Sequence, residues 1–550
     1  MHIGVGKFKY VPGRLSMKYP VILFSLIISI LHSQMPIDYK FSKRSNLNRF
    51  ENITDEGLKN NSIVDIRYID ESYLLLSTAN GLSYAYIYDS HLDSVSFGYF
   101  NSGSVSLPRG GIPALAVRED VITLSGLLDT IAVTGKELMG TGISYSIDEG
   151  ENWTYLPQPK DEIPELGAYH TVLWGGQEIS ALAVTTEINN ISYDLAIGGD
   201  YIYAASWAGG LRRYGPLSSD IKSWQIIPMP MDSDTSLVCG VIDLNAYKLN
   251  PNDPVNNGNH NHKGFSVYVI NDTVWAGTAN GINKGIIESG CINWEHHYTS
   301  VWDNISGNWV IGFANQTLAN GSQRFWAITW AGDGNNEKHA LSYTDNGGES
   351  WYISYPSGNS EKVYNLYTNE SRIWAASESG LYVSEDGEHW EKYSRLIDTL
   401  TGEEILSESV LAVYHQDNWL WLGTVDGIGI INAENEITTT IHRFWETANQ
   451  FSVFPNPFLI NDYNVVGNDG HVRFVYSNPN GLPGKIDVFD FSMDKVIHLD
   501  NSNPFTLEDN QNEIIWNGRN EYGEKISNGV YFCRLSLNGK YSWTKLAVIN

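Results

Sequence analysis

The sequence predicts an all-β fold, and three observations lead to that prediction. Short alternating runs of apolar residues recur along most of the chain, separated by glycine and other turn residues. Aromatic residues make up 12% of the 550 residues and there are 51 glycines, which suits many short strands joined by tight turns. After Trp445 the recurring pattern stops and a different series of short strands begins. We therefore expect a large repeat domain followed by a smaller β domain.

The repeat domain is recognised by one short phrase that recurs in variant forms. Each copy follows an apolar run and a polar turn, and contains a strand, a glycine turn and a further strand. This order is that of an antiparallel meander. The copies are "YLLLSTANGLSY" from Tyr73, "IYAASWAGGLRRYG" from Ile202, "VWAGTANGINKG" from Val274, "IWAASESGLYVS" from Ile373 and "LWLGTVDGIGIIN" from Leu420.

The spacing of these units predicts a seven-bladed β-propeller over residues 50–445. The turn glycines Gly380 and Gly427 lie 47 positions apart, whereas Gly210 and Gly281 lie 71 apart, so insertions are added to a basic period. A four-stranded blade takes about 40–50 residues, and radial packing of blades buries the faces of each meander. The repeated tryptophans are expected to pack between blades. The expected units begin near Ile63, Ile112, Ile179, Phe265, Val310, Val363 and Val410.

Closure of the ring is expected from the N-terminal side. The stretch before the first unit parallels the stretch before the last unit. Residues Arg49 to Ile53 are therefore expected to form an outer strand that completes the seventh blade.

The longest insertions are expected on one rim of the propeller, where a ligand or partner would dock. They cover residues 125–142, 157–178 and 229–263. For each tryptophan packing is the favoured role, and for each aspartate an ordinary turn role is favoured. His260 and His262 lie in an Asn-rich insertion without a third ligand, so a loop role is favoured over metal binding. The candidate rim residues are His170, Trp174, Trp207, Trp330, Asp333 and Asp426.

Two features of the repeats resemble known propeller families. The phrase W-x-G-T-x-x-G-L/I resembles the propeller repeats of periplasmic sensors in two-component regulators. Three segments resemble the Asp box of sialidases and other propellers, a resemblance that implies a structural hairpin turn between outer strands with a tryptophan packed beneath it. The matching residues are Ser146, Asp148, Gly150 and Trp153, then Asn346, Gly348 and Trp351, then Glu385, Gly387 and Trp390.

The C-terminal part, residues 446–550, predicts an Ig-like β-sandwich. A Pro-Asn-Pro turn in "FSVFPNPF" begins it, and about seven short alternating strands follow. The residues resemble the C-terminal sorting domain of type IX secretion cargo and the Ig-like domain of the flagellar hook-capping protein, although only Lys545 precedes the final "LAVIN". This implies recognition by the outer-membrane secretion machinery; the alternative is a sandwich that only caps the propeller. The matching turn and core residues are Pro455, Asn456, Pro457, Trp516, Gly518, Gly523, Gly529 and Tyr531.

The N-terminal part predicts export. Lys18 precedes an apolar run from Val21 to Leu31 and a possible cleavage position at Ser33, so residues 1–33 are expected to be an extension and a signal peptide, and 34–49 a linker. An uncleaved membrane anchor is the alternative, and either Met1 or Met17 could be the start. We expect a secreted or cell-surface protein that passes through the periplasm.

Composition and motif searches limit the function classes. The 63 acidic and 35 basic residues give a net charge of −28, which disfavours nucleic-acid binding. No HExxH, CxxC, GxSxG or P-loop motif occurs, so no metal or other cofactor is expected. Cys239 and Cys291 either pair, or all three cysteines are buried thiols.

A sialidase is disfavoured as well. The segment "LPRGGIP" fits the sialidase Arg-Ile-Pro pattern poorly, and the adjacent Arg212 and Arg213 are expected on opposite faces of a strand. The favoured function is a monomeric, non-enzymatic binding module for a glycan or protein partner. The alternative is a secreted Asp-box-type glycoside hydrolase with two rim carboxylates.

Overall fold

The computed structural model describes residues 57–549, apart from short segments. These segments are 71, 89–94, 101–105, 133–134, 162–166, 189, 253–257, 300–303, 333, 335, 394, 433–436, 445–450, 462–464, 467–468, 479 and 502–510. The prediction of an all-β fold is confirmed, because strands dominate the described part and its one labelled helical element is the 3₁₀ turn η3 (His260–His262). No helix in the described residues has the length and apolarity needed to cross a membrane.

Consecutive antiparallel strands form a series of sheets between Ile63 and His442. The described residues contain seven of them, the number of repeat units in the sequence. The first sheet consists of β1 (Ile63–Asp70), β2 (Tyr73–Thr78), β3 (Gly81–Ile87) and β4 (Val95–Tyr99), and the second of β5 (Leu115–Arg118), β6 (Val121–Ala132), β7 (Gly135–Ser146) and β8 (Thr154–Leu156). The third consists of β11 (Ser192–Gly198), β12 (Tyr201–Ser206), β13 (Gly210–Gly215) and β14 (Ser223–Ile227). The fourth consists of β16 (Gly264–Ile270), β17 (Thr273–Thr278), β18 (Gly281–Glu288) and β19 (Cys291–His297), with β15 (Ser236–Leu237) added at its edge. The last three are β20 (Trp309–Thr317), β21 (Gln323–Trp330), β22 (Ala340–Thr344), β23 (Tyr352–Ser354); β24 (Val363–Thr368), β25 (Ile373–Ser377), β26 (Gly380–Ser384), β27 (Glu391–Tyr393); and β28 (Val410–Gln416), β29 (Trp419–Thr424), β30 (Gly427–Asn432), β31 (Thr438–His442).

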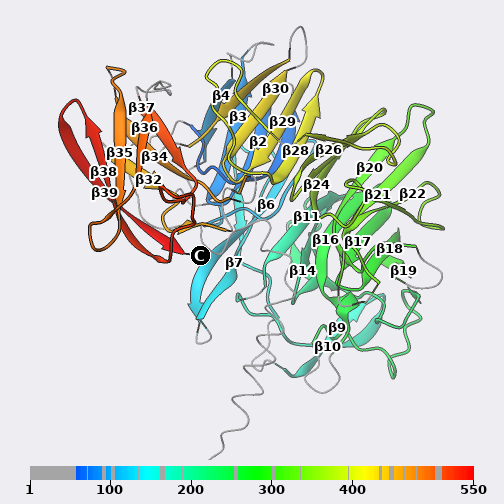
Figure 1. Ribbon diagram of the computed structural model, residues 1–550. Coiled ribbons are helices and arrows are strands. Elements are labelled where there is room, and N and C mark those ends of the chain that lie inside the picture. The colour runs from blue at the N-terminus through cyan, green and yellow to red at the C-terminus, as the bar shows by residue number, and fades with distance from the viewer. Residues whose placement is uncertain are drawn as a thin grey trace, which may run out of the picture.

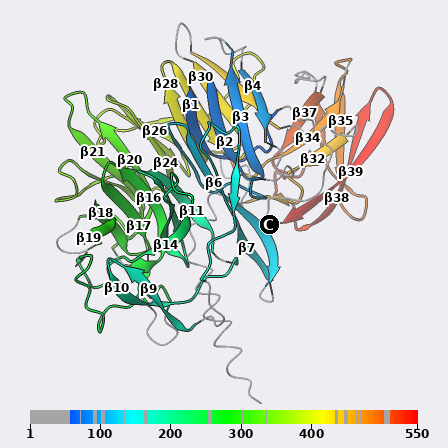
Figure 2. The same ribbon diagram turned by 180° about the vertical axis from the view of Figure 1, so that it is seen from behind.

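The sheets stand around a common centre (Figures 1 and 2). The first strand of each sheet packs against the first strand of the next, and β28 of the last sheet packs against β1 of the first. Polar groups on these inner strands link neighbouring sheets. The Asp194 carboxylate accepts the Val267 N–H at 3.0 Å, and the Ser266 hydroxyl donates to the Val310 carbonyl at 2.8 Å. The arrangement is that of a β-propeller.

The recurring phrase is explained by the turn that it forms between the second and third strands. In four sheets a hydroxyl donates to the carbonyl of the glycine three residues later, at 2.8–3.1 Å. These glycines have φ between +104° and +146°, a region that side-chain-bearing residues rarely adopt. These four copies of the phrase therefore share a hydroxyl-bearing residue and a glycine because the turn requires both. The pairs are Thr78–Gly81, Thr278–Gly281, Ser377–Gly380 and Thr424–Gly427.

The tryptophans of the phrase pack between sheets, as predicted. Trp275 stacks on Phe325 of the next sheet with ring centroids 4.3 Å apart. Trp421 is buried in a cluster shared by the first and last sheets. Burial of a large aromatic side chain is among the strongest single contributions to a core.

One predicted unit is wrong. Ile179 does not begin a blade but lies in β10 (Gln177–Leu182), which pairs with β9 (Tyr169–Trp174) as a separate hairpin. The third sheet begins at Ser192. The hairpin alternates apolar and polar residues as a blade strand does, so periodicity alone could not separate the two.

Asn61 joins the two ends of the ring. Its side-chain amide donates to the Phe444 carbonyl at 3.0 Å, and its backbone carbonyl accepts the Gly427 N–H at 2.8 Å. The seventh sheet takes its outer strand, β31, from its own unit. The stretch from Arg49 to Ile53, predicted to supply that strand, lies outside the described residues.

The C-terminal part forms two sheets over one core. One sheet has the order β32 (Phe451–Phe454), β34 (Val472–Ser477), β37 (Gln511–Trp516), and the other β33 (Phe458–Leu459), β39 (Lys540–Ile549), β38 (Gly529–Leu537), β35 (Gly484–Phe489), β36 (Lys495–Asn501). Phe474 and Trp516 from the first sheet and Val488, Cys533 and Leu546 from the second meet in the core. We call this part the sandwich.

The sandwich residues named from the sequence lie in its turns and its core. Trp516 and Tyr531 are buried, and the Tyr531 hydroxyl donates to the Ser527 carbonyl at 2.8 Å. The Asn456 side chain bonds to β39 at Lys545 and Ala547, like a short strand partner. The remaining residues are Pro455 and Pro457 beside it, Gly518 and Gly523 at positive φ, and Gly529 at the start of β38.

Candidate functional site

Two of the three insertions that the sequence placed on one rim, 157–178 and 229–263, come together over the third and fourth sheets. The described residues of the third insertion, 125–142, lie on β6 and β7 of the second sheet. The β9–β10 hairpin and the segment 229–263 are joined by backbone hydrogen bonds, from Leu182 to Leu249 at 2.8 Å and from Leu249 to Ser180 at 2.9 Å. A disulfide between Cys239 and Cys291 ties the second segment to β19, with Cα atoms 6.1 Å apart. The structure thus decides the open question of pairing. We call residues 167–182 and 229–263 the insertion layer.

A small pocket lies between the insertion layer and the turn that follows β12. Its polar lining residues are Asp161, His170, Arg212 and His262. Arg212 and Asp161 form a buried ion pair at 2.8 Å. Burial alone would raise the pKa of the Asp161 carboxyl, but Arg212 and N–H donors hold it below its usual value. This pair fastens the segment before the hairpin to the third sheet.

His262 is a structural residue at the base of the layer. Its Nδ1 accepts the Asn250 N–H and its Nε2 donates to the Met229 carbonyl, both at 2.9 Å. Burial lowers the pKa of His262 to about 4. Among the described residues no group of three or more His, Cys, Asp or Glu side chains is placed to hold a metal ion.

His170 and Trp174 both lie on β9. His170 lines the pocket, whereas Trp174 is buried and faces the Arg213 guanidinium, 5.0 Å from the ring centroid. Arg213 also lies over Tyr201 and donates to Gln225, on the opposite side of β13 from the Arg212 pair, as strand alternation predicts. The structure therefore brings His170 to the rim and places Trp174 in the packing beneath the hairpin.

Trp207 and Trp330 are also packing residues. Trp207 stacks on Phe265 with centroids 5.2 Å apart. Trp330 donates its indole N–H to the Val363 carbonyl of the next sheet at 2.9 Å. Asp333, the candidate nearest to Trp330, lies outside the described residues.

Exposed apolar side chains lie on the insertion layer, a feature that sequence reasoning missed. Leu173, Val238, Val241 and Leu244 are 72%, 51%, 78% and 47% exposed. The two segments that carry them are in contact near Gly175, which comes shortly after Leu173, and Cys239, which follows Val238. A Cβ atom added to Gly175 would lie 2.3 Å from the Cys239 sulfur. In sequence each of these residues reads as part of an ordinary apolar run, so only their position outside the blades reveals the feature.

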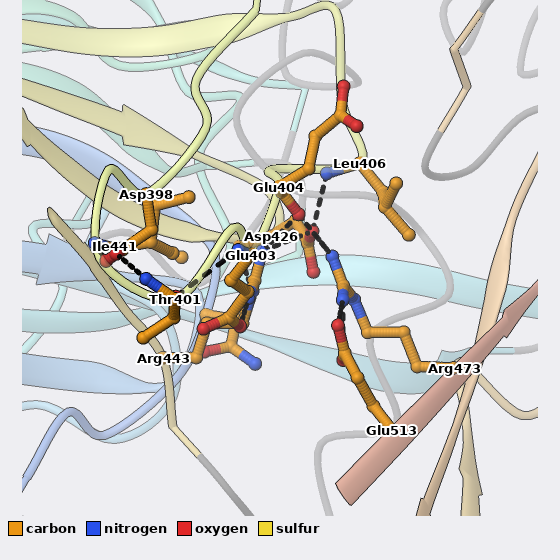
Figure 3. A network of polar contacts seen from close by, with 12 residues as sticks. Asp398, Thr401, Glu403, Glu404, Leu406, Asp426, Ile441, Arg443, Arg473 and Glu513 are labelled. Atoms are coloured by element: carbon orange, nitrogen blue, oxygen red, sulfur yellow. Dashed lines mark hydrogen bonds and ion pairs between the residues drawn. The ribbon is translucent and has the colours of Figure 1, made fainter. Parts of the chain in front are cut away.

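Asp426, the remaining rim candidate, is buried under the sandwich (Figure 3). Its carboxylate accepts hydrogen bonds from the Leu406 N–H at 2.7 Å, from Arg443 at 3.2 Å and from Arg473 of β34 at 2.7 Å. The expectation of an open ligand-binding position is wrong for this residue. The physical reason is that the sandwich covers this part of the rim, which no repeat pattern encodes.

The three Asp-box-like turns join the third and fourth strands of the second, fifth and sixth sheets. In the first, Ser146 donates to Asp148 at 2.7 Å and accepts the Gly150 N–H at 2.9 Å. Thr344, Asn346 and Gly348 repeat this pattern. Trp153 is half-buried and Trp351 is buried beside its own turn.

The assignment of Glu385 to the third turn is wrong. Ser384 donates to Asp386 and accepts the Gly387 N–H, while Glu385 points outward and pairs with Arg372 at 3.1 Å. The turn is one residue shorter than the pattern between its carboxylate and its glycine, so matching Gly387 and Trp390 shifted the acidic position by one. Trp390 donates to the Gly387 carbonyl, as a packed turn residue would.

Carboxylates on the described rim hold loops. Glu337 accepts the N–H groups of Gly332 and Asn308 at 2.6 and 3.0 Å. Glu361 accepts the Ser377 hydroxyl at 2.7 Å, and Asp398 accepts the Ile441 N–H at 3.0 Å. Each of these side chains stabilises a connection between sheets.

Comparison with known proteins finds solved structures that resemble this chain but does not assign the chain to a family. No protein-family model matches the chain, and no curated protein matches it. PorZ, described as a surface component of the type IX secretion system of Porphyromonas gingivalis, is 13% identical over 88% of this chain and 65% of its own, with a TM-score of 0.34. The chain thus spans about two thirds of PorZ.

Two glycoside hydrolases of family GH74 are similar at the same level. The enzyme of Niastella koreensis is 12% identical over 90% of this chain and 67% of its own, with a TM-score of 0.46. The xyloglucanase of Xanthomonas campestris is 11% identical over 78% and 59%, with a TM-score of 0.43. At these values the likeness assigns neither an activity nor a partner.

Proposed function

We propose that this chain is a secreted or cell-surface binding protein whose insertion layer contacts a partner, and whose sandwich directs export. The observation that carries the proposal is the set of exposed apolar side chains on the insertion layer, Leu173, Val238, Val241 and Leu244. Exposed apolar surface of this kind marks interaction sites on soluble proteins.

The chemistry of the insertion layer favours a protein partner over a glycan. Among its described residues, four of the five exposed large apolar side chains are aliphatic, Tyr169 being the fifth, which suits the apolar centre of a protein interface. Aromatic rings, which offer flat faces for stacking, are buried at Trp174 and Trp207. Backbone hydrogen bonds of Leu249 join the two segments of the layer, and the disulfide ties the layer to the fourth sheet, so little order has to be gained on binding.

The disulfide also supports a location outside the cytoplasm. Structural disulfides form and persist in oxidising compartments and are rare in the cytosol of most organisms. This fits the export signal expected from the N-terminal sequence.

The outer face of the sandwich offers a surface for the secretion machinery. Tyr541 and Trp543 on β39 are 63% and 49% exposed, and Phe491, in the turn between β35 and β36, is 80% exposed. The Arg534 guanidinium lies 5.0 and 5.7 Å from the Tyr541 and Trp543 ring centroids. Aromatic residues and arginine are enriched at protein interfaces, which supports recognition of this face by a protein partner.

The alternative, a glycoside hydrolase, depends on two rim carboxylates about 5–10 Å apart that flank an open cleft. Five rim carboxylates accept hydrogen bonds from protein groups or pair with arginine: Asp161, Glu337, Glu361, Asp398 and Asp426. Binding is therefore the better supported role.

The binding role is tested with one double variant and one control variant of the full chain. Leu173→Asp with Val241→Asp should abolish cross-linking to the partner on living cells. Ile147→Asp, an exposed position on an Asp-box-like turn, should not change it. Equal cross-linking by all three proteins would contradict the assigned surface. Release of reducing ends from a polysaccharide panel by the purified protein would favour the hydrolase instead.

The export role is tested in the same cells. Tyr541→Ser with Trp543→Ser should leave folded protein in the periplasm, while Tyr352→Ser, an exposed tyrosine of the fifth sheet, should be released normally. Normal release of the double variant would contradict recognition through this face.

A further inference from the structure

The contact between the propeller and the sandwich is made by buried charges. Arg473 on β34 is fully buried and donates to Asp426 and to the Glu404 carbonyl of the propeller, both at 2.7 Å. Its other nitrogen binds Glu513 on β37 at 2.6 Å. Figure 3 shows the Arg473 side chain reaching from the sandwich toward the turn that carries Asp426.

The propeller supplies a second cation on the same carboxylate. Arg443, also buried, donates to Asp426 at 3.2 Å and to the Glu404 carbonyl at 2.7 Å, and it pairs with Glu403. Burial alone would lower the pKa of Arg473, but the carboxylates of Asp426 and Glu513 raise it above the usual value of a guanidinium. The Arg473 guanidinium therefore stays charged, whereas burial and the nearby Arg473 lower the pKa of Arg443. The two domains share one cluster of buried charged groups.

Separating the domains would leave parts of this cluster without compensation. Asp426 would lose one of its two cations, and Arg473 would keep Glu513 but lose the Asp426 carboxylate and the Glu404 carbonyl. Separation exchanges these short, charge-assisted hydrogen bonds for hydration, and salt screens the buried charges of the docked state much less than exposed ones. A backbone contact from the Glu408 N–H to the Val465 carbonyl at 3.2 Å adds to the interface.

We propose that the rim of the seventh sheet, centred on Asp426, is a docking site for the chain's own sandwich. The site holds the sandwich noncovalently, so that the two parts remain one particle after the connection at residues 445–450 is cut. This goes beyond the export role, because it concerns what happens to the sandwich after delivery and holds whether or not export depends on it.

The arrangement of acceptors around position 473 suits the guanidinium group of arginine. One planar guanidinium contacts a carboxylate and a carbonyl of the propeller while binding a carboxylate of its own domain. An ammonium group is a compact charge with a different donor arrangement and does not reproduce this fork. Lysine at this position should therefore weaken the docking even though it keeps the charge.

The experiment cuts the full chain and asks whether the fragments separate. A site for a specific protease is inserted between residues 445 and 450, the purified protein is cleaved, and the products are run on a sizing column at 0.15 M and 0.5 M NaCl. The propeller and the sandwich should co-elute at both salt concentrations. Separation of the wild-type fragments on cleavage would overturn the proposal.

Three variants test the role of the buried cluster. Arg473→Met should raise the fraction of free sandwich roughly tenfold or more, and Arg473→Lys should give an intermediate value. Arg519→Met is the matched control, because Arg519 pairs with Asp469 within the sandwich and is partly exposed. Equal co-elution of the Arg473→Met and Arg519→Met fragments would overturn the assignment.

A folding control keeps the result interpretable. Each uncut variant is checked by circular dichroism and by its elution volume. If Arg473→Met does not fold, Asp426→Asn introduces the same defect from the propeller side and must release the sandwich after cleavage. Retention by that folded variant would overturn the docking site.

Discussion

Acidification should loosen the insertion layer through His262. The imidazole accepts a hydrogen bond from Asn250 and donates one to Met229, an arrangement that only the neutral ring can make. Burial lowers its pKa to about 4, while the nearby Asp232 raises it and His296 lowers it. The layer therefore depends on His262 remaining unprotonated.

The sign and size of the effect follow from this pKa. The folded pKa of about 4 lies below the unfolded value of about 6.5, so the unfolded state binds more protons between these values. The stabilisation is complete above pH 6.5 and is lost as the pH falls toward 4. Between pH 7.5 and 5 the loss is about 2 kcal/mol, or about a 30-fold rise in the local opening constant.

Hydrogen exchange of peptides within residues 229–263 measures this directly, after correction for the intrinsic exchange rate at each pH. Protection in the wild-type protein should fall about 30-fold between pH 7.5 and 5. In His262→Gln, which can donate and accept without titrating, most of that fall should disappear. An equal fall in both proteins would refute the reasoning, as would unchanged protection in the wild type.

Further predictions concern the disulfide, a turn and the core. Cys239→Ser should destabilise the fourth sheet and its insertion by about 4 kcal/mol, given the separation of 52 residues, and reductant should give the wild type the same thermal unfolding onset; unchanged onsets would contradict this. Gly427→Ala should cost about 1–3 kcal/mol, because its φ is +114° and a Cβ would lie 2.6 Å from a carbonyl oxygen. Gly290→Ala, at φ +80° with open space around it, should cost less in chemical denaturation, and equal costs would refute the steric part. Trp326→Ala should cost about 3–5 kcal/mol in the same assay, since the side chain is fully buried, and a loss below about 1 kcal/mol would show that its packing matters little.

The repeated part of the fold could be predicted from sequence because each unit repeats a local requirement. Thr424 and Gly427, for example, recur wherever the same turn recurs, and their spacing is visible without any knowledge of tertiary contacts. The same reasoning failed for the β9–β10 hairpin, because its sequence has the periodicity of a blade strand and only its packing partners differ.

The candidate site was predictable only where it followed from chain connectivity. Insertions between sheets had to emerge on one rim, which placed His170 correctly near the pocket. The burial of Asp426 depends on Arg473, which lies 47 residues further along in another domain, and no local pattern announces that contact. The exposure of Leu173 and Val241 likewise depends on the insertion layer lying outside the ring.

Asn61 has a consequence for how the molecule is made. It bonds to Phe444, 383 positions away, so the circle of sheets cannot close until the last of them has been synthesised. Until then, the side of β1 that packs against β28 in the finished ring lacks that neighbour, and the sheets behave as an open stack. Contacts of such long range form slowly, and open strand surfaces invite association with other chains. Keeping the nascent chain extended until its final third is available would therefore limit such association. The last sheet is the element that closes the ring.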